Sequence, residues 1–140
     1  MTRIIVTGIG GRMGSRIADI VRETSGLTLA GATEAPGSFA IGTTLPEGQQ
    51  VVDDLSKNIA HGDVVIDFTS PKATIHHAEI AAKAGKALVV GTTGFSDEEK
   101  HKLTALLKTM PSVFSSNMSI GMNVLFKIAA LQVPPQATED

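Results

Sequence analysis

The chain has 140 residues, of which 42% are hydrophobic and 19% charged, and its formal net charge is −2. These values fit one soluble globular domain and argue against nucleic acid or an anionic membrane as a partner. The sequence has no cysteine, no apolar run of membrane-spanning length and no signal-peptide pattern. We therefore expect a cytoplasmic protein without disulfides or a metal site.

The N-terminal stretch carries the most informative pattern. A short apolar run at residues 4–6 reads as a buried strand, four glycines follow, and a helical pattern begins directly after them. A strand, a glycine turn and a helix in this order are typical of a dinucleotide phosphate loop. The glycines are Gly8, Gly10, Gly11 and Gly14, and the apolar helix face is Met13, Ile17, Ile20 and Val21.

The glycine spacing departs from the strict G-x-G-x-x-G motif, because Met13 stands where that motif has its last glycine. The fit is G-x-x-G-x-x-G. We expect Gly8 to permit the tight turn, Gly10 and Gly11 to admit a pyrophosphate, and Gly14 to let the helix approach the sheet. The helix N–H groups would face the phosphates. A tight turn without a ligand is the alternative.

A second strand is predicted at residues 27–33, and it ends at Glu34. Dinucleotide folds place an acidic residue about 20 positions after the glycine motif, where its carboxylate accepts two hydrogen bonds from the ribose diol. Glu34 lies 20 positions after Gly14. We assign it to the adenine ribose, and a solvated glutamate at a strand end is the alternative.

The remaining elements follow in alternation. Residues 35–50 read as a surface loop, because they contain three glycines and two prolines and show little periodicity. Ser70 and Pro71 open one later helix and a Ser-x-x-Glu capping box opens another. The predicted segments are an edge strand at 50–53, a brief helix at 55–60 ended by Gly62, a strand at 63–69, a helix from 70 to Gly85, a strand at 86–90, a helix from 96 to about 108, a strand at 112–115 and an apolar helix at 119–131.

This alternation predicts an α/β fold, a Rossmann-like doubly wound parallel sheet with helices on both faces. Ligands bind beyond the carboxyl ends of such strands, where small, polar or glycine-rich segments gather. We assign residues 1–131 to a dinucleotide-binding domain and 132–140 to a tail. The predicted helix at 119–131 is apolar on nearly all sides. We therefore expect its surface to be buried, either by self-association or by a partner domain.

Four motifs together resemble dihydrodipicolinate reductase, the lysine and diaminopimelate pathway enzyme of bacteria and plants. They are the glycine loop at 6–14, the strand and turn at 65–71, the Gly-Thr-Thr-Gly loop at 90–95 and the Ser-Ser-Asn-Met-Ser segment within 115–123. The resemblance runs from residue 4 to about residue 130. It covers the N-terminal, nucleotide-binding half of the family's enzyme.

The resemblance implies a role for each matched segment. The glycine loop would hold the pyrophosphate, Glu34 the ribose, the 91–93 loop the nicotinamide ribose, and the 115–118 segment the nicotinamide and the hinge. Phe68 would pack near the nicotinamide, with a plain core role as its alternative. The implied cofactor-binding residues are Gly8, Ile9, Gly10, Gly11, Arg12, Met13, Glu34, Phe68, Gly91, Thr92, Thr93, Ser115, Ser116, Asn117 and Met118.

The family's catalytic His-His-Arg-His cluster, with its lysine, belongs to a second domain and is absent here. We therefore assign no catalytic residue and expect this chain alone to be inactive. The full enzyme would be a homotetramer that passes hydride from the nicotinamide to the cyclic dicarboxylate 4-hydroxy-tetrahydrodipicolinate. Adjacent His76 and His77 point about 100° apart on a helix, so we expect them, with His61 and His101, to be surface or packing residues that do not share one site.

One departure from the family concerns the cofactor. Members that use NADPH well often have arginine directly after the acidic residue, and here Ala35 stands there. Alanine offers no partner to a 2′-phosphate, so we predict that NADH is preferred, with NADPH possible if Arg12 reaches the phosphate. Two alternatives stay open: a stand-alone nucleotide-binding or sensing module, and the cofactor domain of another reductase such as a homoserine or semialdehyde dehydrogenase.

Overall fold

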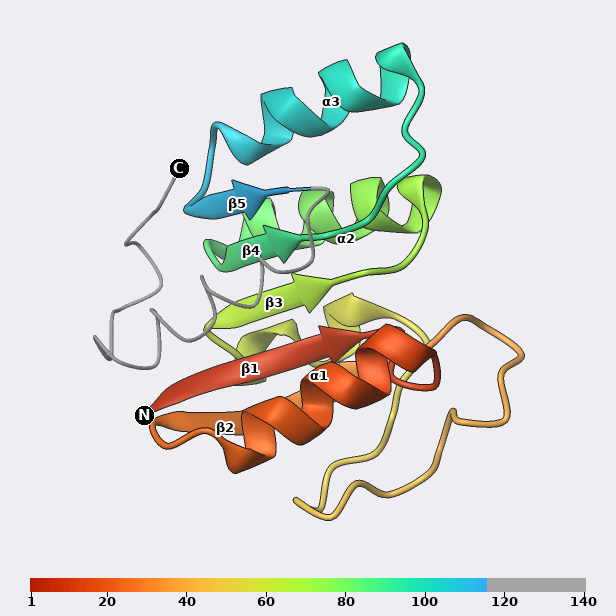
Figure 1. Ribbon diagram of the computed structural model, residues 1–140, viewed down its shortest axis with the longest axis vertical. Helices are drawn as coiled ribbons and strands as arrows, with labels where there is room; N and C mark the ends of the chain where they lie inside the picture. Colours follow the sequence, from red (N-terminus) through yellow and green to blue (C-terminus); the bar gives the residue numbers. More distant parts are fainter. Residues whose placement is uncertain (116–140) are drawn as a thin grey trace.

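The computed structural model describes residues 1–115 (Figure 1). Five parallel strands form one sheet in the order β2-β1-β3-β4-β5, which confirms the predicted Rossmann-like α/β fold. The elements in chain order are β1 (Thr2–Thr7), α1 (Arg12–Glu23), β2 (Leu27–Thr33), the 3₁₀ turns η1 (Leu55–Lys57) and η2 (Ile59–His61), β3 (Val64–Asp67), α2 (Pro71–Ala84), β4 (Ala87–Val90), α3 (Asp97–Leu107) and β5 (Ser112–Phe114).

Alternation along the strands divides the core into two layers. In β1, Ile4 and Val6 pack with α1 residues, whereas Ile5 packs on the opposite face with residues of α2 and α3. In β3, Val65 shares the face of Ile5. Both faces of a central parallel strand are therefore buried. After β2 the sheet grows on the other side of β1, through β3, β4 and β5, and this change places α1 on one face and α2 and α3 on the other (Figure 1), as right-handed crossovers require.

The predicted helix boundaries are confirmed where the sequence carries a capping signal. Ser70 caps α2, which begins at Pro71, and Gly85 ends it in the left-handed region at φ 68°. At α3, Ser96 and Glu99 form both bonds of the capping box. These signals act over three or four residues, so they can be read without knowledge of the tertiary structure.

Two predicted elements differ from the structure. Residues 50–53 form only isolated bridges, Thr44 with Gln50 and Thr33 with Val52. The brief helix predicted at 55–60 is two 3₁₀ turns instead, because Asn58 interrupts helical geometry at ψ 5°. The helix predicted at 119–131 and the tail lie outside the described residues.

No helix within residues 1–115 is long and apolar enough to cross a membrane.

An ion pair between Arg3 and Asp63 links the start of β1 to the residue before β3. The Arg3 side chain donates to both carboxylate oxygens of Asp63, at 2.8 and 3.2 Å, and the Arg3 backbone N–H donates to Asp63 Oδ2 at 2.8 Å. Burial raises the pKa of Asp63, but the bonds from the Arg3 side chain and backbone outweigh it, so the pKa lies below its usual range. The folded state therefore favours the ionised carboxylate.

We predict that Asp63→Asn lowers the free energy of unfolding at pH 7 and that the loss shrinks in acid. A carboxyl whose pKa is lower in the folded state stabilises the fold above its unfolded-state pKa, about 3.9. This contribution disappears as the pH falls through the folded-state pKa. Urea denaturation of both proteins from pH 7 to pH 2.5 measures the difference, with Asp97→Asn on the surface of α3 as the control. A difference that is independent of pH would contradict the ion-pair account.

Candidate functional site

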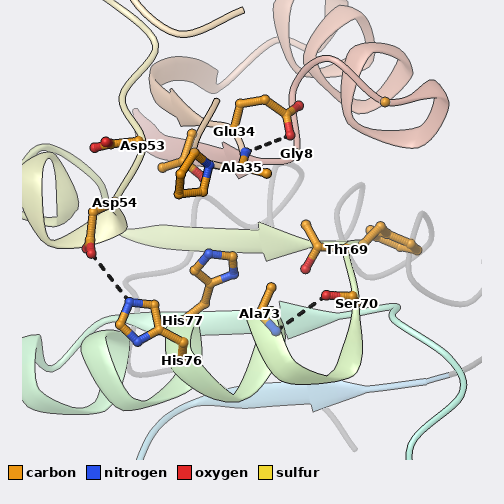
Figure 2. Close-up of a pocket in the computed structure, with 14 residues that line it drawn as sticks. Gly8, Glu34, Ala35, Asp53, Asp54, Thr69, Ser70, Ala73, His76 and His77 are labelled. Atoms are coloured by element: carbon orange, nitrogen blue, oxygen red, sulfur yellow. Dashed lines mark hydrogen bonds and ion pairs between the residues drawn. The ribbon is translucent and has the colours of Figure 1, made fainter. Parts of the chain in front are cut away.

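A cleft of about 420 Å³ opens where β1, β2 and β3 end (Figure 2). The order in which strands are added reverses at β1, because β2 lies on one side of it and β3 on the other, and such a switch point is where open α/β sheets bind ligands. The cleft is lined from four segments: Gly8 and Gly11 after β1; Thr33, Glu34, Ala35 and Pro36 at the end of β2; Asp53 and Asp54 before η1; and Phe68, Thr69, Ser70, Ala73, His76 and His77 after β3 and along α2.

The glycine loop has the geometry that its spacing predicts. Gly8 turns out of β1 with φ 67°, in the left-handed region. A Cβ at Gly14 would lie 1.9 Å from the Gly8 carbonyl oxygen, far inside van der Waals contact. Only glycine permits this approach between the first turn of α1 and the end of β1.

Helix α1 points an uncapped N-terminus toward the cleft. Its N-cap, Gly11, lines the cleft, has no side chain to accept a hydrogen bond, and is followed by no acidic residue in the first turn. A Cβ at Gly11 would meet only one atom within 4 Å, the Gly8 oxygen at 3.4 Å. The partial positive charge of the helix end therefore has no negative side chain on its own helix to offset it.

Glu34 holds the glycine loop against the end of β2. Its Oε2 accepts a hydrogen bond from the Gly10 N–H at 2.7 Å, and its Oε1 accepts one from the Ala35 N–H at 2.8 Å. The Ile9 N–H donates to the Thr33 carbonyl at 3.1 Å. The residue predicted to bind a ribose thus lies at the cleft and sets the position of the loop predicted to bind phosphate.

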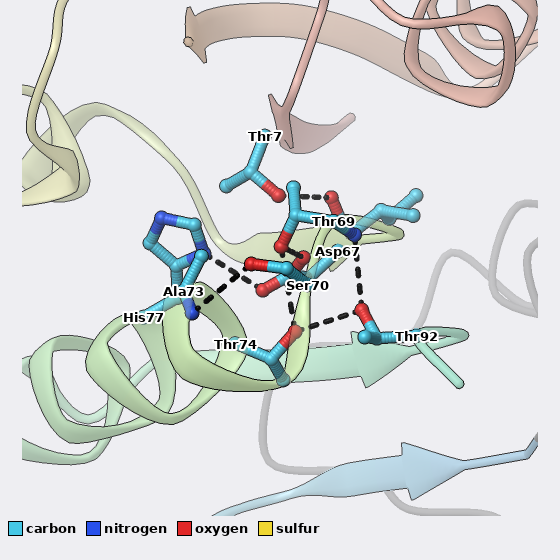
Figure 3. A network of polar contacts seen from close by, with 9 residues as sticks. Thr7, Asp67, Thr69, Ser70, Ala73, Thr74, His77 and Thr92 are labelled. Carbon is cyan, nitrogen blue, oxygen red and sulfur yellow. Dashed lines mark hydrogen bonds and ion pairs between the residues drawn. The ribbon is translucent and has the colours of Figure 1, made fainter. Parts of the chain in front are cut away.

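A buried polar network supports the other wall of the cleft (Figure 3). Asp67, which is fully buried, bonds the His77 ring through Nδ1 at 2.7 Å and accepts from the Thr69 hydroxyl at 2.6 Å. The Thr92 hydroxyl accepts from the Thr69 N–H at 2.9 Å and from the Thr74 hydroxyl at 2.7 Å. These bonds join the ends of β3 and β4 to α2.

His76 and His77 both line the cleft, which was not predicted from the sequence, but they bond different carboxylates and do not converge on one point. Side chains of adjacent helical residues point about 100° apart, so these two rings cannot meet at one point. Both rings can still line one broad cleft. His77 is half-buried over Asp67, whereas His76 is exposed and its Nε2 lies 3.4 Å from Asp54 Oδ2. The expectation that they are packing and surface residues fits this arrangement.

The predicted cofactor residues divide among several places. Gly8, Gly11, Glu34 and Phe68 line the cleft. A second cleft of about 450 Å³ is lined by residues after β4 and β5, and it contains three of the predicted residues. Its lining is Thr92, Thr93, Gly94, Phe95, Lys100, Phe114 and Ser115.

Other predicted residues line neither cleft. Gly10 contacts the Glu34 carboxylate, Ile9 and Met13 pack against the α1 side of the core, and Arg12 is exposed. Ser116, Asn117 and Met118 lie outside the described residues.

Phe68 lines the first cleft and packs against Gly91. A Cβ at Gly91 would lie 1.8 Å from the Phe68 ring, so the ring covers this glycine closely. Phe68 also packs partly against the α1 side of the core. Phe68 therefore has the core role that was the alternative for it and also lines the first cleft, while its contact with a nicotinamide stays a prediction.

Ten of the fourteen lining residues are outside the predicted cofactor-binding set, although Ala35 was named for the cofactor preference: Thr33, Ala35, Pro36, Asp53, Asp54, Thr69, Ser70, Ala73, His76 and His77. A signal for three of them existed, because Ser70, Ala73 and His77 stand at helical spacings of three and four, on one face of a helix that begins at the carboxyl edge of the sheet. For Asp53 and Asp54 no local signal exists. Within residues 1–115, no three His, Asp or Glu side chains are grouped to hold a metal ion.

Residues 2–118 match the family model "Dihydrodipicolinate reductase, N-terminus". The chain is similar to 4-hydroxy-tetrahydrodipicolinate reductase of Anaeromyxobacter dehalogenans strain 2CP-1, with 50% identity over 135 residues that cover 91% of this chain and 50% of the relative. It is also similar to the reductase of the same name from Desulfotalea psychrophila, with 46% identity over 92% of this chain and 51% of the relative. The chain thus spans about half the length of these relatives.

Solved structures share the fold. A dipicolinate-bound dihydrodipicolinate reductase from Paenisporosarcina sp. TG-14 matches with a TM-score of 0.67 and 24% identity, over 94% of this chain and 53% of that one. An amine dehydrogenase from Mycobacterium smegmatis matches with a TM-score of 0.62 and 22% identity, over 81% of this chain and 38% of that one. At these identities the likeness concerns the fold.

We predict that Gly14→Ala destabilises the fold by about 3 kcal/mol or more, because the added Cβ overlaps a backbone oxygen that cannot rotate away. Gly11→Ala is the matched control, since it adds the same methyl three residues earlier, at φ −80° and in open space. It should cost about 1 kcal/mol or less, as a change of N-cap residue does. Chemical denaturation of the two variants measures the contrast, and equal losses would contradict the close-approach account.

Proposed function

This chain belongs to the dihydrodipicolinate reductase family, and we propose that its cleft between β1 and β3 binds a nicotinamide dinucleotide. The observation that carries the proposal is convergence: the glycine loop, the uncapped N-terminus of α1 and Glu34 all meet at this cleft. Each feature alone could serve the fold without any ligand, as a tight turn or a glutamate at a strand end does. Together they offer a positive helix end and a carboxylate at one switch point, which is what a nucleotide's phosphates and ribose require.

The pyrophosphate would lie at Gly8 to Met13, over the start of α1. The open space at Gly11 admits a phosphate close to the backbone, and the helix end favours its negative charge. Arg12 is exposed at the same turn, and its guanidinium would add a charge-assisted bond.

Glu34 would bind the adenine ribose. Each of its carboxylate oxygens accepts one backbone N–H in this structure, and a carboxylate has about four acceptor positions. The remaining positions can take the two ribose hydroxyls while the glycine loop stays attached. This arrangement would make the ribose and pyrophosphate positions depend on each other.

The nicotinamide half would extend past Phe68 toward the second cleft. Gly91, Thr92 and Thr93 would lie along its ribose, and residues 115–118 would border the nicotinamide. The buried bonds of the Thr92 hydroxyl support this extension, because they fix the 91–93 loop to the end of β3.

For the whole protein, we propose the reaction of 4-hydroxy-tetrahydrodipicolinate reductase in lysine and diaminopimelate biosynthesis. The cofactor would supply hydride to a cyclic dicarboxylate, while residues 1–131 hold and orient it. The acid, the substrate contacts and the homotetramer interface would come from a second domain, in keeping with relatives of which this chain covers 50%. We assign no catalytic residue to this chain and propose that it is inactive alone.

We further propose that NADH is preferred to NADPH. A 2′-phosphate would meet Ala35, which cannot donate a side-chain hydrogen bond, beside the Glu34 carboxylate. An unpaired phosphate next to a carboxylate is disfavoured by repulsion that the ribose hydroxyl of NADH does not suffer.

We predict that NADH binds about tenfold more tightly than NADPH, a difference of about 1.4 kcal/mol. Calorimetric titration measures both dissociation constants, and it suits a chain without Trp or Tyr. Glu34→Gln should weaken NADH binding and reduce the discrimination, whereas Glu98→Gln on the surface of α3 should change neither. Equal or tighter NADPH binding would refute the preference, and binding of neither dinucleotide would refute the proposed function.

A further inference from the structure

The segment before η1 runs beside the end of β2 as a short parallel extension of the sheet. The Val52 N–H donates to the Ala32 carbonyl at 3.2 Å, and the Glu34 N–H donates to the Val52 carbonyl at 2.9 Å. Thr33 is thereby paired with Val52 in parallel. The next residues on both chains, Glu34 and Ala35 on one and Asp53 and Asp54 on the other, follow this pairing and line the same cleft.

Both aspartates are held as anions. The Lys57 ammonium, 2.6 Å from Asp53 Oδ1, lowers the pKa of that carboxyl. The Ser56 backbone N–H, which donates to Asp54 Oδ1 at 2.8 Å, is the main cause of the lowered pKa of Asp54, and His76 adds to it. Both groups therefore carry negative charge at neutral pH.

The charge around Ala35 is accordingly one-sided. Glu34, Asp53 and Asp54 all line the cleft, and no lysine or arginine among residues 1–115 lines it. Lys57 partly offsets Asp53, whereas the described contacts of Asp54 are an N–H group and an imidazole, not a permanent cation. Of the two aspartates, Asp54 thus contributes the larger uncompensated charge to the cleft that Ala35 also lines (Figure 2).

We infer that Asp53 and Asp54, with Asp54 dominant, are specificity-determining residues that reject a 2′-phosphorylated dinucleotide. The inference rests on the proposed function, and it adds a repulsive element to the missing arginine at position 35. Discrimination by repulsion acts only on the wrong ligand and leaves the contacts of the right one in place.

The same geometry limits what an arginine at position 35 can achieve. A guanidinium introduced there would share the cleft with the Asp53 and Asp54 carboxylates. It would pair with them in part and offer less of its charge to a phosphate. The gain in NADPH affinity from Ala35→Arg should therefore grow when Asp54 is neutralised, so the two substitutions are coupled and not additive.

The test is a double-mutant cycle read by calorimetry with NADH and NADPH. The four proteins are the unmodified chain, Asp54→Asn, Ala35→Arg and the double variant. Asparagine keeps an acceptor oxygen for the Ser56 N–H and removes only the charge. Asp97→Asn, with the same charge change on the surface of α3, controls for net charge.

We expect Asp54→Asn to shift the ratio of the NADPH and NADH dissociation constants toward NADPH by about three- to tenfold. Asp97→Asn should leave the ratio unchanged. Ala35→Arg should strengthen NADPH binding more in the Asp54→Asn background than in the unmodified chain.

Three results would overturn the inference. The first is an equal effect of Asp54→Asn on both dinucleotides, or no effect beyond that of Asp97→Asn. The second is an additive cycle. The third is a preference of the unmodified chain for NADPH. If NADH binds and one of these results is found, the inference alone fails. If the unmodified chain binds neither dinucleotide, the proposed function fails and takes the inference with it.

Discussion

The approach of helix α1 to the end of β1 is the constraint on which the site depends. The backbone at Gly14 lies so close to the Gly8 carbonyl that a Cβ there would stand 1.9 Å from its oxygen. This contact fixes where α1 begins, and therefore where its uncapped N-terminus points. Because β1 borders the switch point of the sheet, that direction is into the cleft. A side chain at position 14 would move the helix and with it the whole glycine loop.

The cleft combines one positive group with three negative ones. The positive terminus of α1 lies at the glycine loop, where Glu34 also bonds the Gly10 N–H, and Asp53 and Asp54 line the cleft from the segment before η1. The helix terminus favours a phosphate, whereas the carboxylates favour neutral hydroxyls and disfavour further negative charge. The pyrophosphate and the neutral adenine-ribose hydroxyls of NADH suit this combination, and NADPH adds a phosphate to that ribose.

Local sequence signals predicted the parts of the structure that local interactions determine. The bounds of β2 follow from its apolar run, the start of α2 from Ser70 and Pro71, and the turn after β1 from the glycines. The bridge between Thr33 and Val52 could not be predicted, because its partners are 19 residues apart and the loop between them has no periodicity. Asp53 and Asp54 were missed for that reason, since only this pairing brings them to the cleft.

The hydrogen bonds of the buried Asp67 side chain also could not be predicted from local sequence patterns. The sequence places Asp67 at the end of a buried strand, which says nothing of its partners. In the structure a buried carboxylate is acceptable because the His77 ring and the Thr69 hydroxyl both bond it. His77 comes from α2, ten residues later, so its place in the cleft depends on how the helix packs on the sheet.

If a dinucleotide binds on the glycine loop between β1 and β3, as we propose, its phosphates must lie beside the backbone amides of that loop. Amide-resolved NMR titration of the ¹⁵N-labelled chain with NADH tests this contact. We predict that the amide signals of Gly8, Gly10, Gly11 and Glu34 shift in a saturable way, while those of Gly48 and Gly85, in turns outside the cleft lining, stay in place. Saturable binding that leaves the glycine-loop signals unmoved would contradict it.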